Sequence, residues 1–97
     1  MALHPQVAAF AAQLDDLSRL LRGQGDRLWA DRIDLIQRAV ADSNYAGVAR
    51  FLDLFDGEGG FAGFTLPDRQ AQAQLSTCRA AAHAMARRLA KEEGAGD

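Results

Sequence analysis

Apolar residues recur along this chain at alternating spacings of three and four, the period that gathers side chains on one face of an α-helix. The first such segment covers residues 5–22. Pro5 suits a first helical turn, and Gly23 and Gly25 end the pattern. The apolar positions are Val7, Phe10, Leu14, Leu17 and Leu21. The spacing therefore predicts a helix with one face for a core.

A second segment, residues 26–41, repeats the pattern. Asp26 is the expected N-cap, and charged residues occupy the positions between the apolar ones. Trp29 keeps register with the isoleucines behind it, so we expect it to be buried rather than to serve as an exposed binding residue. The apolar positions are Trp29, Ile33, Ile36 and Val40.

A third, shorter helix is predicted over residues 43–55, with Asp42 or Ser43 as its cap. Its apolar positions are Tyr45, Val48, Phe51, Leu52 and Phe55. A Gly-rich loop follows, and it is long enough for the next helix to cross the others at a different angle.

The last predicted helix covers residues 66–92, with Thr65 as its cap and with Pro67 and Asp68 in its first turn. Its apolar positions are Ala71, Leu75, Cys78, Ala82, Met85 and Leu89. No segment has the period of two that is typical of strands. The fold class is therefore all-α: a single-domain four-helix bundle over residues 1–93, with a flexible tail at 94–97.

Composition narrows the range of functions. The chain has 97 residues, of which 48% are hydrophobic and 25% are charged, and its net charge is −2. The length and the hydrophobic fraction favour one soluble domain, and a domain this small could gain stability by forming a homodimer. The absence of excess basic charge argues against a nucleic acid partner. The single cysteine, the lack of a signal peptide and the lack of a long apolar run predict a cytoplasmic protein with no membrane association.

The loop from Gly57 to Phe64 is the first candidate site. Backbone N–H groups in such a turn can bind an anion, but Asp56 and Glu58 would repel a phosphate there. The carboxylates of this stretch reproduce only fragments of a calcium loop, so we predict no metal. Phe61 and Phe64 either pin the loop to the bundle or contribute to a binding surface.

The last helix carries the second candidate site. Arg79, His83 and Arg87 follow one another at i, i+4 spacing and predict a basic stripe. Such a stripe suits the acidic surface of a protein partner, an internal contact with Asp53 or Asp56, or water. Cys78 lies on the apolar face, where it is expected to pack rather than to react. No catalytic constellation is present, so we expect neither an enzyme nor a cofactor.

Several short stretches resemble a group of small bacterial all-helical proteins of unassigned function. In that group a leucine pair, a glycine, a Trp-Ala pair, a short helix containing a glycine and a "GGxGS"-like turn follow in this order. The resemblance covers residues 14–66, with Asp56 in place of a glycine of the turn and Gly60 in place of its serine. It implies an all-helical fold and, by analogy, an immunity-type role beside a toxin. The matching residues are Leu20, Leu21, Gly25, Trp29, Ala30, Gly47, Phe51, Leu52, Phe55, Gly57, Gly60 and Leu66.

The sequence as a whole favours a small non-catalytic protein–protein interaction module of the immunity or adaptor type. The candidate partner-binding residues are Arg79, His83, Arg87, Asp56, Glu58, Phe61 and Phe64. The alternative is a ligand- or metal-binding domain with a pocket under the loop from Gly57 to Phe64, using Asp56, Glu58 and His83 as polar groups.

Overall fold

The computed structural model describes residues 5–42, 44–56 and 60–95, and over these residues the chain is an all-α bundle without strands. The elements are α1 (Pro5–Gly23), α2 (Arg27–Ala41), α3 (Ala46–Asp53), the 3₁₀ turn η1 (Phe61–Gly63) and α4 (Arg69–Ala95). The all-α class and the four helices predicted from the spacing are confirmed. The bounds of α3 and α4 differ from the prediction.

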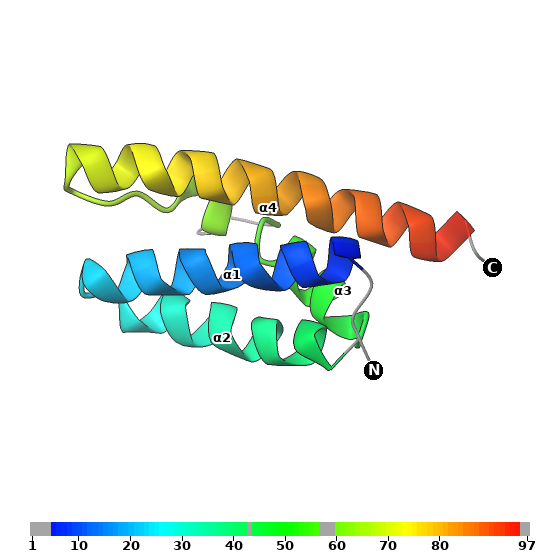
Figure 1. The fold of residues 1–97 in the computed structure, drawn as a ribbon. Helices are drawn as coiled ribbons and strands as arrows, with labels where there is room; N and C mark the ends of the chain where they lie inside the picture. Colours follow the sequence, from blue (N-terminus) through cyan, green and yellow to red (C-terminus); the bar gives the residue numbers. More distant parts are fainter. Residues whose placement is uncertain (1–4, 43, 57–59, 96–97) are drawn as a thin grey trace.

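The turn between α1 and α2 follows from two residues. Gly25 takes a φ of 84°, which favours glycine, and its N–H donates to the Arg22 carbonyl while the Asp26 N–H donates to the Leu21 carbonyl. The Asp26 side chain then accepts a hydrogen bond of 2.9 Å from the Trp29 N–H, as expected of an N-cap. The turn is short, so α1 and α2 run antiparallel (Figure 1).

The helix α3 begins later and ends earlier than predicted. Asp42 caps the end of α2 rather than the start of α3, and the predicted cap Ser43 lies outside the described residues. The Asn44 side chain accepts a hydrogen bond from the Ala46 N–H, which holds the backbone in a turn before the helix begins. Gly47 permits close packing on α2, because a Cβ there would lie 2.9 Å from Val40 and 3.1 Å from the Ile36 carbonyl.

The start of α4 was also predicted too early. Asp68, not Thr65, is the cap: its carboxylate accepts a hydrogen bond of 2.8 Å from the Ala71 N–H. Leu66 precedes Pro67, which disfavours a helical conformation at Leu66, and residues 64–66 have no regular secondary structure. The other end of α4 runs to Ala95, so the helix enters the stretch predicted as a flexible tail.

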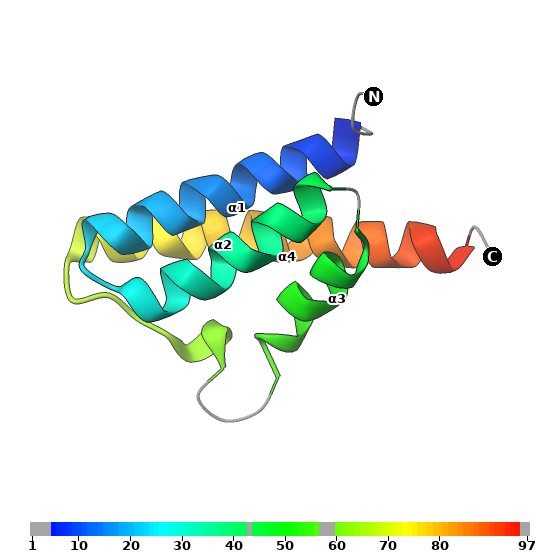
Figure 2. The same cartoon turned by 90° about the horizontal axis from the view of Figure 1, so that it is seen from below.

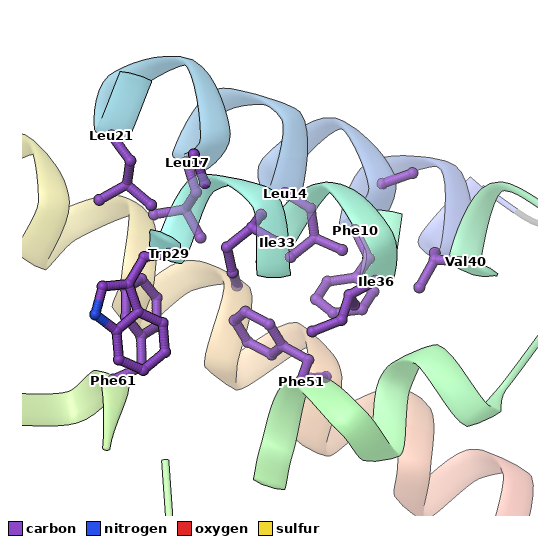
Figure 3. Packing of buried hydrophobic residues seen from close by; sticks show 14 of the residues in the cluster. Phe10, Leu14, Leu17, Leu21, Trp29, Ile33, Ile36, Val40, Phe51 and Phe61 are labelled. Carbon is purple, nitrogen blue, oxygen red and sulfur yellow. The ribbon is translucent and has the colours of Figure 1, made fainter. Parts of the chain in front are cut away.

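The helices are arranged around α1. It lies between α2 and α4, and α4 runs in the same direction as α2, while α3 packs against both α2 and α4 (Figures 1 and 2). Their inner faces supply one core, in which Phe10 and Phe51 meet edge to face with 5.3 Å between ring centroids (Figure 3). The outer side of α2 is not covered by another helix (Figure 2).

Candidate functional site

The loop aromatics lie inside the molecule. Phe61 has 0% of its surface exposed, and its ring lies between Trp29, at a centroid distance of 4.9 Å, and Phe55, at 5.7 Å. Phe64 is half-buried and its ring lies 5.9 Å from that of Trp29. The expected burial of Trp29 is confirmed, with 8% of its surface exposed. Phe61 therefore pins the loop to the bundle, one of the two roles considered for it from the sequence, and its side chain exposes no surface.

Arg79, on α4, also holds the loop that contains Phe61 and Phe64. Its Nη1 donates to the carbonyl oxygens of Phe61 and Phe64, each at 2.7 Å, and its guanidinium lies 5.5 Å from the centre of the Phe61 ring. Burial lowers the pKa of this guanidinium, which still stays charged. Arg79 therefore contacts backbone carbonyls within the fold, which is neither of the internal partners considered from the sequence, Asp53 and Asp56.

The predicted basic stripe is consequently not one surface. His83 is half-buried, with its ring centroid 4.3 Å from that of Phe55. Arg87 is exposed and lines a shallow hollow together with Arg88 and Lys91. Of the three stripe residues, only Arg87 is exposed.

The acidic part of the loop is less fully described. Asp56 is exposed after the end of α3, and Glu58 lies outside the described residues. Among the residues that the structure covers, no group of three or more His, Cys, Asp or Glu side chains is placed to hold a metal ion. Between Gly60 and Phe64, the rings of Phe61 and Phe64 stack with 6.2 Å between their centroids, and Phe61 is fully buried.

The outer side of α2 carries a feature that the sequence reasoning missed. Leu28 and Leu35, which we call the exposed leucine pair, have 62% and 61% of their surface exposed. They are seven residues apart, so they lie almost in line along the helix. The signal was available in the sequence, because both leucines fall off the apolar stripe that begins at Trp29.

A shallow groove lies beside Leu35, between α2 and α3. Its volume is about 270 Å³, and Leu35 and Arg32 lie on its α2 side. The Arg32 guanidinium lies 4.9 Å from the centre of the Trp29 ring, a cation–π contact within α2. We call this the α2–α3 groove; its lining residues are Arg32, Leu35, Ile36, Arg50, Asp53 and Leu54.

A charged network lies along the other side of the pair, where α2 meets α1. Arg22 pairs with Asp31 at 2.8 Å and with Asp34, and the buried Ser18 hydroxyl donates to the same Asp34 carboxylate. Burial raises the pKa of Asp34, but the hydrogen bonds from Ser18 and Arg22 and the charges of Arg22 and Arg38 outweigh it, so the pKa lies below 3.8. The bond to Asp34 is the main cause that raises the pKa of Arg22.

Comparisons with protein-family models, with curated proteins and with solved structures find nothing that matches this chain. The resemblance to small bacterial all-helical proteins therefore stays a prediction. Within the part of the chain that the structure describes, no helix is both long enough and apolar enough to cross a membrane.

Proposed function

We propose that this chain is a non-catalytic protein–protein interaction module, and that it binds through the outer side of α2. The observation that carries the proposal is the exposed leucine pair beside the α2–α3 groove. This surface replaces the loop and the α4 stripe, because Phe61 and Arg79 are engaged within the fold.

The energetics of the exposed leucine pair favour binding. Burying a fully exposed leucine side chain contributes about 1.5–3 kcal/mol of favourable free energy. Leu28 and Leu35 do not make this contribution within the folded chain, so a partner that covers them could gain part of it. A single exposed leucine needs no explanation, but two in line on one helix next to a groove form the apolar centre and charged rim that are typical of interfaces.

The resemblance seen in the sequence favours one form of this proposal. An immunity-type or adaptor protein of a bacterial cytoplasm works by covering part of another protein, and it needs a presented surface rather than a catalytic cleft. The outer side of α2 would be that surface.

Site-specific photo-crosslinking tests the proposal. A photoreactive amino acid replaces Leu35 in the full chain, and the matched control places it at Ala12, which is also exposed but lies on α1. Irradiation of cells that express each variant should give protein adducts at position 35 and few at position 12. Adducts only at position 12, or none at either position in a folded protein, would overturn the proposal.

A further inference from the structure

We infer that the occupant of this surface is a second copy of the same chain. The two copies are related by a two-fold axis that lies between their α2 helices and runs parallel to them. The inference rests on the proposed function, since it names the partner of the same site. It follows from the way charges are arranged on the two sides of the exposed leucine pair.

Asp31 and Arg32 lie between the two leucines along the helix, and on opposite sides of the line that joins them. Successive residues of an α-helix are 100° apart, so Asp31 falls about 40° to one side of Leu35 and Arg32 about 60° to the other. The contacts agree with this geometry. Asp31 pairs with Arg22 on the α1 side, and Arg32 lines the groove on the α3 side.

A two-fold axis parallel to α2 turns this asymmetry into complementarity. The axis places Leu28 against Leu28 and Leu35 against Leu35 of the second copy, and it brings each side of one helix to the opposite side of the other. Asp31 of each copy then lies beside Arg32 of the other, as flanking charges do in parallel helix pairs. Both charge pairs are attractive, and the apolar pair is covered between them.

The groove supports the same arrangement. Arg32, Arg50 and Asp53 line it, and none of the three has an ion-pair partner within 4.0 Å among the described residues. The side that a second copy would bring to this groove carries Asp31 and Asp34 together with Arg22 and Arg38, so both facing sides carry charges of both signs. Each carboxylate accepts from Arg22 and has lone pairs left for a further donor. Few residues take part, so the association should be weak and dependent on concentration.

Sedimentation of purified charge variants tests the inference. Asp31→Arg gives a chain with two arginines between the leucines, and Arg32→Asp gives a chain with two aspartates there. Each variant alone faces like charges across the axis, so its dimer dissociation constant should rise by roughly tenfold or more relative to the natural chain. An equal mixture of the two variants faces opposite charges only, and the dimer should return. Recovery in the mixture also shows that both variants are folded.

Cysteine crosslinking fixes the direction of the axis. In a Cys78→Ser background, Leu35→Cys alone should form a disulfide-linked dimer, because the axis places Leu35 against Leu35. An antiparallel arrangement would instead link Leu28→Cys to Leu35→Cys only when the two variants are mixed, and that result would overturn the axis inferred here.

Different experimental results would overturn this inference and the proposed function. If the natural chain sediments at its monomer mass of 10.5 kDa at every concentration, the second copy is not the occupant. Adducts at position 35 with a different protein would then leave the proposed function standing. Adducts of twice the chain mass at position 35 support both.

Discussion

Phe61 and Leu35 are both large apolar side chains with charged residues close to them in the sequence, yet one has no exposed surface and the other has 61%. Phe61 comes from a glycine-rich loop and lies in the core, because Trp29 and Phe55 surround its ring and Arg79 supplies the donors that its loop carbonyls need. Leu35 comes from a regular helix and lies outside, because the inner face of α2 is already filled by other residues. Secondary structure alone therefore did not separate core from surface in this molecule.

The largest expected effect lies on the buried side of this comparison. Phe61→Ala removes a fully buried ring and should lower the free energy of unfolding by about 3–5 kcal/mol. Denaturant titration measures it, with Leu35→Ala as the matched control, which should stay within about 0.5 kcal/mol. Equal losses in the two variants would contradict the contrast between the two sites.

Arg79→Met tests whether the loop depends on its two hydrogen bonds. The substitution keeps much of the aliphatic stem but removes both hydrogen bonds. The Phe61 carbonyl keeps the Phe64 N–H as a donor, whereas the Phe64 carbonyl loses its donor, so we expect a loss of about 1.5–3 kcal/mol. The control Arg87→Met removes an exposed charge from the same helix and should change stability by less than about 0.5 kcal/mol. A loss in the control as large as in Arg79→Met would mean that helix charge, and not the loop, is responsible.

A smaller effect concerns the charged network beside the exposed leucine pair. Because the pKa of Asp34 is lowered in the folded chain, its contribution to stability is present above the ordinary value of 3.8 and is lost as pH falls through the lower folded value. Asp34→Asn should remove this acid-labile part, which amounts to less than about 1 kcal/mol since the carboxylate is partly exposed.

Urea titrations at neutral pH and below pH 3.8 measure this difference. Ser18→Ala should weaken the same acid-labile part, because it removes the buried hydroxyl that donates to Asp34. If stability falls with acid as steeply in Asp34→Asn as in the natural chain, the acid-labile part has another source.

The smallest effect on stability belongs to the exposed leucine pair itself. Leu35→Glu should leave the unfolding free energy within about 0.5 kcal/mol of the natural value, since the side chain has few internal contacts to lose. The same substitution should abolish the dimer in sedimentation, because it brings two carboxylates together on the axis. Ala12→Glu, the same charge on an exposed position of α1, should affect neither measurement.

Much of the fold could be predicted from local patterns. The Asp26 cap and the end of α1 at its glycines follow from residues within one turn of each other, where local chemistry decides the outcome. The predictions of Asp42 as the cap of the third helix and of Thr65 as the cap of the fourth were wrong. Asn44 and Asp68 compete with neighbouring residues of similar capping strength, and Pro67 restricts the residue before it.

The candidate site could not be predicted to the same degree. Helix geometry places Arg79, His83 and Arg87 on one side of α4. Whether that side contacts the loop or the solvent depends on how the loop between α3 and α4 packs against the helix. The sequence pattern did not single out Leu28 and Leu35, because the apolar positions that begin at Trp29 were enough to predict the helix without them.

The sequence by itself determined that this chain forms four helices with one apolar face each, since helical period, caps and glycine turns act between residues close along the chain. The tertiary structure alone decided which apolar and charged side chains remain exposed. That outcome depends on contacts between distant segments: Arg79 with the loop, Phe61 with Trp29, and Arg22 with Asp34. These contacts pull the loop aromatics inward and leave the outer side of α2 uncovered.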